Sequence, residues 1–335
     1  LGAAYYIAVT IKQPLTALAV FFIAVLMVIA ATYLIFISGS VVLCRALQKN
    51  KRYYYQKNHF ISVSSMAYRM KRNGAGLASI CILATMVLVM LSSTTCLYFG
   101  KEDALRTRYP SDLSVELRFV KDEGGMDEAN IAIARGMIED VIKQDGLDVQ
   151  GQFDIRSAWF SGLLTGNTFT RAQESTLMDY ERAVDLTILP LEDYARMMGE
   201  RLTLEPGEAY LCSPRMAYTQ PDLRIGELTY QIKGQLPGFG GFGADSANIT
   251  TTIYLIVPDF DAAVNALRTQ NTRYPVVVSW QYSFDSGSPD EAQIAFLRDM
   301  MGTFADNREG LVYASYTVES IAFNRGDFVL SLIHI

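Results

Sequence analysis

The stretch "YRMKRNGAGLASICILATMVLVMLSS" (residues 68–93) decides the organisation of the chain, because it turns from basic to apolar within a few positions. It leads into Gly76–Phe99, which carries no charged side chain, and a second uncharged stretch, Leu15–Ile37, precedes it. A helix of about 23 residues is about 35 Å long, and the hydrocarbon core of a bilayer is about 30 Å thick. Both stretches are therefore predicted to be transmembrane helices, and residues 1–10 the end of a preceding one.

Charge divides the chain at the same place. Residues 1–99 contain nine of the 29 Lys and Arg residues and no acidic residue, so residues 100–335 carry all 35 Asp and Glu and a net charge of −15. Eight of the nine basic residues lie in 38–75, and short loops rich in Lys and Arg stay in the cytoplasm. We therefore expect residues 38–75 inside and residues 100–335 outside. The acidity of the outer part is explained equally well by solubility or by attraction of cationic ligands.

The basic loop contains a segment with one apolar helical face. In "FISVSSMAYRMKRN" (residues 60–73), apolar side chains recur at spacings of three and four, at Phe60, Val63, Ala67 and Met70. This pattern predicts an amphipathic helix on the lipids of the inner membrane surface, breaking near "NGAG" (residues 73–76) before the next span. An ordinary cytoplasmic helix packed on its neighbours is the open alternative. The candidate elbow residues at the inner membrane surface are Tyr68, Arg69, Lys71 and Arg72.

The acidic part alternates between strand-like and helix-like patterns, which predicts one extracellular α+β domain over residues 100–328. Strands are expected over residues 111–120, 152–160, 209–213, 228–233, 251–257 and 274–284. Helices are expected over residues 126–146, 259–270 and 288–304. We interpret residues 329–335, part of an apolar run that ends the sequence, as a truncated or artefactual tail.

Motifs that carry chemistry are absent from the sequence. It contains no GxxxxGK[ST], HExxH or GxSxG, and its two histidines make a zinc site of the usual spacing improbable. "GFGGFG" (residues 238–243) has the glycine spacing of a dinucleotide site but lacks the flanking strand and helix. We read it as a loop whose Phe239 and Phe242 are weak candidates for ligand or lipid contact. The chain is therefore predicted not to be an enzyme, with no catalytic, cofactor-binding or metal site, and not to bind nucleic acid.

The ordered stretch "TYLIFISGSVVLCRALQKNKRYYYQKNHFISVSSMAYRMKRNGAGLASICILATMVLVMLSS" (residues 32–93) resembles FtsX-like permeases of ABC transporters. It is most similar to the bacitracin and peptide-antibiotic (BceB-type) subfamily. "KNKRYYY", "YRMKRNGAGL" and the span that follows carry the resemblance, together with one large outer domain after that span. The resemblance implies a multi-pass fragment in a bacterial cytoplasmic membrane.

The same resemblance implies partners. ATP would be bound and hydrolysed by a separate ABC subunit, and the permease would handle or sense cationic or lipid-bound peptide antibiotics, sometimes with a two-component histidine kinase. The main contact with the ATPase belongs to a region beyond Ile335. Alternatives are a mechanotransmission or signalling permease that controls a cell-wall hydrolase or kinase, and extraction of lipids or lipoproteins.

Overall fold

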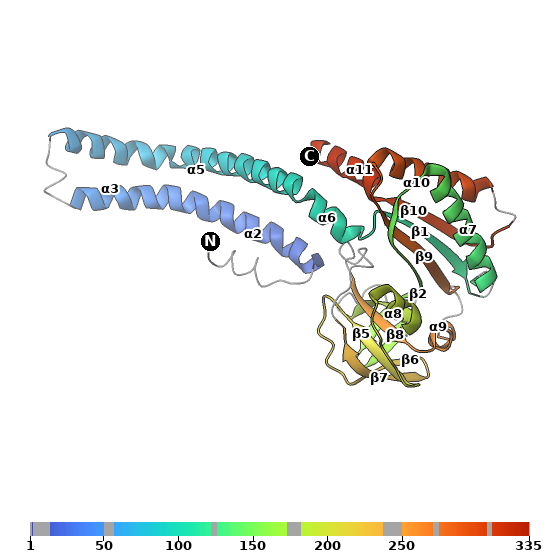
Figure 1. Ribbon diagram of the computed structural model, residues 1–335. Helices are drawn as coiled ribbons and strands as arrows, with labels where there is room; N and C mark the ends of the chain where they lie inside the picture. Colours follow the sequence, from blue (N-terminus) through green and yellow to red (C-terminus); the bar gives the residue numbers. More distant parts are fainter. Residues whose placement is uncertain are drawn as a thin grey trace. The chain divides into compact units, whose positions relative to one another are not determined.

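The computed structural model describes Gly2 and residues 14–49, 57–121, 126–172, 182–236, 250–270, 275–306 and 310–334. Its internal contacts divide the chain into two compact units, Leu1–Phe99 and Gly100–Ile335. The first is helical and the second is rich in β-strands (Figure 1).

The first unit consists of long apolar helices. Helix α2 (Pro14–Leu34) continues through a π-helical turn, η1 (Ile35–Gly39), into α3 (Ser40–Lys49), and α5 spans Lys57–Phe99. Within the described residues, Val20–Gly39 and Gly74–Phe99 are long and apolar enough to cross a membrane, by length and composition. Large apolar side chains of both helices are exposed in the structure, as expected of helices that are hydrophobic on all sides.

The predicted break at residues 73–76 is wrong, because α5 continues through it without interruption. A Cβ on Gly74 would lie 3.4 Å from the Phe36 carbonyl oxygen, so this glycine lets α5 approach η1 closely. Gly74 thus serves helix packing, although a glycine costs a helix about 1 kcal/mol relative to alanine. The segment 38–75 is also more helical than expected, since it contains α3 and the start of α5. The candidate elbow residues Tyr68, Arg69, Lys71 and Arg72 lie on the α5 backbone, and their side chains are outside the described part.

Hydroxyl groups in this unit find partners on the helices themselves. The Tyr33 hydroxyl and Ser79 Oγ are 2.8 Å apart, which joins α2 to α5. Thr85, Thr94 and Thr95 each donate to the carbonyl four residues earlier. Such bonds satisfy the hydrogen-bonding capacity of these hydroxyl groups, which the hydrocarbon of a membrane cannot do.

The second unit is built on a sheet of ten strands. They are β1 (Leu113–Val120), β2 (Val149–Thr165), β3 (Thr168–Arg171), β4 (Ala183–Pro190), β5 (Glu208–Cys212), β6 (Asp222–Ile225), β7 (Leu228–Gln235), β8 (Thr251–Val257), β9 (Val277–Ser286) and β10 (Ser315–Ser320). The order is β10-β1-β9-β2-β3-β6-β7-β5-β8-β4, and β4 also pairs with β2. That last pairing closes the seven strands from β2 to β4 into a barrel, which β9, β1 and β10 extend as an open antiparallel sheet.

Helices α7 (Glu128–Asp145) and α10 (Asp290–Asp306) cover one face of the open sheet, and α8 (Leu191–Met198) and α9 (Phe260–Arg268) lie on the outside of the barrel (Figure 1). The remaining helices, α6 (Lys101–Arg108) and α11 (Ile321–His334), pack on each other. Asp127 caps α7 by accepting from the Asn130 amide at 2.8 Å, and Gly146 ends it at φ +64°. The tail expected at 329–335 is helical as far as His334, as part of α11.

Alternation along the strands separates the core from the opposite face. On β1 and β9, every second side chain is buried, and these side chains belong to one core with α7 and α10. The core residues of these two strands are Leu113, Val115, Leu117, Phe119, Val278, Trp280, Tyr282 and Phe284. The six predicted strands and three predicted helices are confirmed within a few residues, except that β2 is twice as long as expected. Strands β3, β4, β6 and β10 were not predicted, because β3, β6 and β10 have only four to six residues and β4 is buried along nearly its whole length.

Gly162 on β2 tests how tightly the barrel is packed. A Cβ at this position would lie 2.3 Å from the Thr170 carbonyl oxygen and 2.5 Å from the Phe169 ring. We therefore expect Gly162→Ala to lower the free energy of unfolding by about 2–3 kcal/mol, as overpacked cores do. Denaturation of the full chain in detergent, followed by tryptophan fluorescence, measures this, because Trp159 and Trp280 both lie in the second unit.

Gly302→Ala is the matched control. Gly302 lies inside α10, and a Cβ there meets nothing within 4 Å. This change should raise the free energy of unfolding by about 0.5–1 kcal/mol. Equal effects from the two substitutions would contradict the packing described at Gly162.

Candidate functional site

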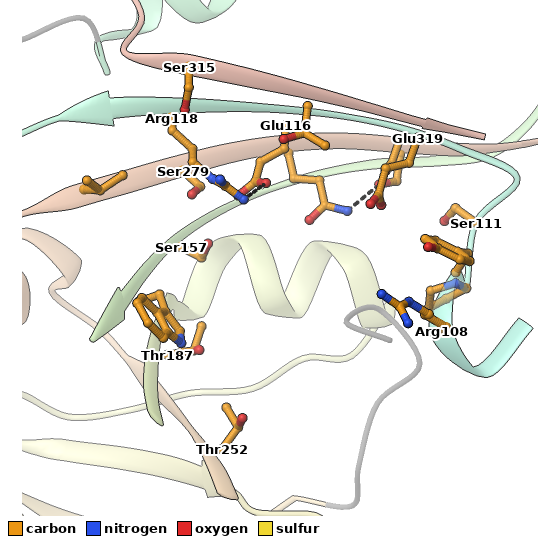
Figure 2. A pocket seen from close by; sticks show the side chains of 18 of the residues that line it. Arg108, Ser111, Glu116, Arg118, Ser157, Thr187, Thr252, Ser279, Ser315 and Glu319 are labelled. Carbon is orange, nitrogen blue, oxygen red and sulfur yellow. Dashed lines mark hydrogen bonds and ion pairs between the residues drawn. The ribbon is translucent and has the colours of Figure 1, made fainter. Parts of the chain in front are cut away.

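A cavity of about 800 Å³, lined by both polar and apolar side chains, lies over the face of the sheet that the α7–α10 core leaves uncovered. Its walls come from β10, β1, β9, β2, β4 and β8 and from residues 108–111, which begin at the last residue of α6 (Figure 2). The volume lies within the range of about 300–1,000 Å³ that small-molecule sites occupy.

Strand register places the polar side chains of the open sheet in rows. Residues that oppose one another in antiparallel strands have neighbouring side chains. One row holds Glu319, Ser114 and Ser283; the next holds Thr317, Glu116 and Gln281; the third holds Ser315, Arg118 and Ser279. The cavity therefore presents hydroxyl and amide groups around a few charges.

The wall on the barrel side combines an exposed indole with buried polar groups. Trp159 of β2 is 56% exposed, whereas the polar lining residues Ser157, Asp185, Thr187 and Thr252 are buried. The Asp185 carboxylate accepts a hydrogen bond from the Thr250 hydroxyl. Thr252 is only 4% exposed, and its Oγ1 has no hydrogen-bond partner among the described residues. Buried polar groups are normally paired, so an unpaired one lining a cavity indicates a missing polar partner.

Charges in the cavity are close to balance. Three carboxylates, Glu116, Asp185 and Glu319, face two guanidinium groups, Arg108 and Arg118. Arg118 Nη2 donates to Glu116 Oε2 at 2.7 Å. Burial, followed by repulsion from Glu116, raises the pKa of Glu319, and Arg108 and a hydrogen bond from Ser114 oppose that rise only in part. The lining is therefore closer to neutral than a count of its acids suggests.

Helix α6 positions the segment that closes one end of the cavity. Arg106 Nη2 lies 2.7 Å from the buried Asp112 carboxylate, which also accepts from the Ser286 amide at 2.8 Å. The Asp112 amide in turn donates to Asp285 at 3.1 Å. These bonds fix residues 108–111 against the ends of β1 and β9.

A second ionic group joins α6 to the last helix. Arg325 of α11 contacts Glu102 of α6 at 3.0 Å and Asp290 of α10 at 2.7 Å. We call Arg325, Glu102 and Asp290 the α6–α11 clamp. The hydrogen bonds that Arg325 donates to Glu102 and Asp290 raise the pKa of its guanidinium above the ordinary value. The clamp holds together α6 and α11, the first and the last helix of the second unit, and α10.

The strand shared by sheet and barrel is held by a third ionic group. Arg156 of β2 donates to the buried Asp193 of α8 through its backbone amide at 2.9 Å and its Nε at 2.8 Å. The hydrogen bond that Arg156 donates to Asp193 is the largest cause that raises the pKa of Arg156. Trp280 Nε1 and Arg135 both donate to Asp154, also on β2, at 3.0 and 2.9 Å. The cavity wall at Ser157 and Trp159 follows directly after these anchors.

The sequence did not identify this site. Phe239 and Phe242, the weak ligand candidates, lie outside the described residues, and the candidate elbow residues belong to the other unit. Among the described residues, no group of three or more His, Cys, Asp or Glu side chains could hold a metal ion. The signal available in the sequence was the alternation of polar and apolar residues in "SVELR" and "VSWQYS". The polar residues of these two strands become neighbours only through the pairing of β1 with β9, which are far apart in the chain.

No protein-family model and no curated protein matches the chain. The side chains that line the cavity are then the evidence for what it binds, and they include hydroxyls, an amide, carboxylates, guanidiniums and one exposed indole. Convergent polar groups around an aromatic ring suit recognition of a small polar ligand.

Glu319→Gln tests the electrostatics of the cavity. Because the folded state raises the pKa of Glu319 above its ordinary value of 4.5, it favours the protonated side chain. The stability contributed by that proton is present at low pH and is lost as the pH rises through the raised pKa. We therefore expect the melting temperature of the variant to exceed that of the wild type by a margin that grows from about pH 4.5 upward.

Melting curves between pH 4.5 and 8 measure that margin. Glu227→Gln, at an exposed position on the barrel, is the matched substitution. A margin for Glu319→Gln that stays constant or shrinks with pH would contradict the assignment.

Proposed function

We propose that the protein is the permease subunit of an FtsX-like ABC transporter that handles or senses peptide antibiotics. The observation that carries the proposal is the way the chain passes through the second unit. The unit begins with α6, directly after α5 and Gly100, its last helix is α11, and these two helices pack against each other. A domain whose ends meet in this way suits insertion between two membrane-spanning helices.

The composition of the first unit supports the membrane part of the proposal. Two helices have the length and hydropathy of membrane spans, and the chain between them is basic. The two helices would cross a bacterial cytoplasmic membrane. On the positive-inside rule, the basic segment then lies in the cytoplasm and residues 100–335 lie outside the cell. Lipids are then neighbours of both helices.

In this proposal a partner subunit supplies the energy for transport. The sequence contains no phosphate-binding loop, so ATP would be bound and hydrolysed by a separate ABC subunit. The net charge of −15 on residues 100–335 supports cationic peptides as substrates, because opposite charge speeds encounter.

The α6–α11 clamp favours a second candidate, a permease that transmits motion or a signal. Arg325 bonds to carboxylates of two other helices, so displacement of α6 would be passed to α10 and α11. Such coupling would serve control of an outside partner, either a cell-wall hydrolase or a histidine kinase. Extraction of lipids or lipoproteins is a variant of the transport proposal in which the substrate differs.

Cysteine labelling tests the orientation. With the four native cysteines replaced by alanine, we introduce Glu200→Cys on the second unit or Lys49→Cys at the end of α3, both exposed positions. A membrane-impermeant maleimide added to intact cells should label the first variant, and the second only after permeabilisation. The reverse pattern would contradict the proposed topology.

Bacitracin survival tests the function. In a sensitive bacterial host, producing the protein together with its ATP-binding partner should raise the minimum inhibitory concentration of bacitracin. Replacing the phosphate-loop lysine of that partner should remove the effect, because that lysine contacts the nucleotide phosphates. Protection that survives this replacement, or no protection at all, would contradict a transporter that handles bacitracin.

A further inference from the structure

We propose that the cavity over the open sheet binds a neutral, hydroxyl-rich ligand, specifically a short saccharide. This site does not depend on the proposed permease function. Three features of the lining support this: its hydroxyl content (Figure 2), its charge balance and the exposed Trp159.

Hydroxyl groups dominate the polar lining. Serine or threonine side chains come from β1, β9, β2, β4, β8 and β10, and each can both donate and accept a hydrogen bond. Gln281 adds an amide, which donates to Ser283 at 2.9 Å and keeps its oxygen as an acceptor site. A ligand whose own hydroxyls also donate and accept matches such a surface most closely.

Charge balance argues against strongly charged ligands. A cationic ligand would lie near Arg108 and Arg118, and an anion would lie near Glu116, Asp185 and Glu319. Arg118 and Glu116 already neutralise each other at 2.7 Å. Planar carboxylate, amide and guanidinium groups, however, can each bond two neighbouring hydroxyls of a neutral ligand.

Trp159 supplies the apolar part of the site. Its indole is 56% exposed at the cavity wall, although tryptophan is among the residues that bury most surface in folded proteins. The C–H face of a sugar ring is apolar and flat, so it can pack against such a ring while its hydroxyls reach the sheet.

Fluorescence quenching detects occupancy directly. Trp159 is exposed and Trp280 is 1% exposed, so acrylamide should quench mainly Trp159. The full chain is placed in phosphatidylcholine nanodiscs, because maltoside and glucoside detergents carry competing sugars. Maltotriose and chitotriose at millimolar concentrations are the probes, and trilysine and inorganic phosphate are the charged controls.

We expect at least one saccharide to lower the quenching constant of the wild type and to leave the Trp159→Phe variant unchanged. Protection by maltotriose alone would identify a free sugar as the source, and protection by chitotriose alone would identify an N-acetylated wall glycan. Protection by neither, or protection by trilysine or phosphate alone, would overturn the proposal.

Discussion

Strand β2 is the constraint on which the second unit depends, because it belongs to two structures at once. Its first half pairs with β9 in the open sheet, and its second half pairs with β3 and β4 in the barrel. A strand shared in this way fixes the angle at which sheet and barrel meet. The bulge at Gln150–Phe153, where Gly151 adopts φ +57°, bends its beginning. The bonds from Arg156 to Asp193 and from Trp280 to Asp154 hold its middle.

The cavity exists because of this sharing. A flat sheet would expose its polar face to solvent as an open surface. Here β2 pairs with β4, and β4 with β8, so the polar face continues from the open sheet onto the barrel wall. Buried polar groups from the barrel thereby face the rows of hydroxyls on β1 and β9. Polar side chains can stay in such a recess because each is within reach of others or of a polar ligand. The α6 segment, held by Arg106 and Asp112, completes the enclosure.

The sequence predicted the division of the chain and most of the regular elements, because charge and periodicity are local signals. Strand β8, "TTIYLIV", and helix α10 were recognisable from their composition and their first-turn residues. The continuation of α5 through residues 73–76 was not, since Gly74 serves a close contact with η1, which lies far earlier in the chain. The barrel and the cavity depend on which strands pair, and pairings such as Ala158 with Ile188 have no local signature. Trp159 and Thr252, ninety-three residues apart in the chain, could not have been brought together by pattern alone.

The pairing of β4 with β2 also governs how the protein can associate through its backbone. Every open sheet has two edge strands with unsatisfied amide and carbonyl groups, and both are templates for another chain. By folding one end of its sheet back on β2, this unit leaves β10 as the single terminal strand among those that the structure describes. Glu319 lies on β10, and α11 begins at Ile321, directly after that strand. A charged residue and an adjacent helix both disfavour the pairing of another chain with an edge strand. The fold thus limits sheet-to-sheet growth to one short, polar border.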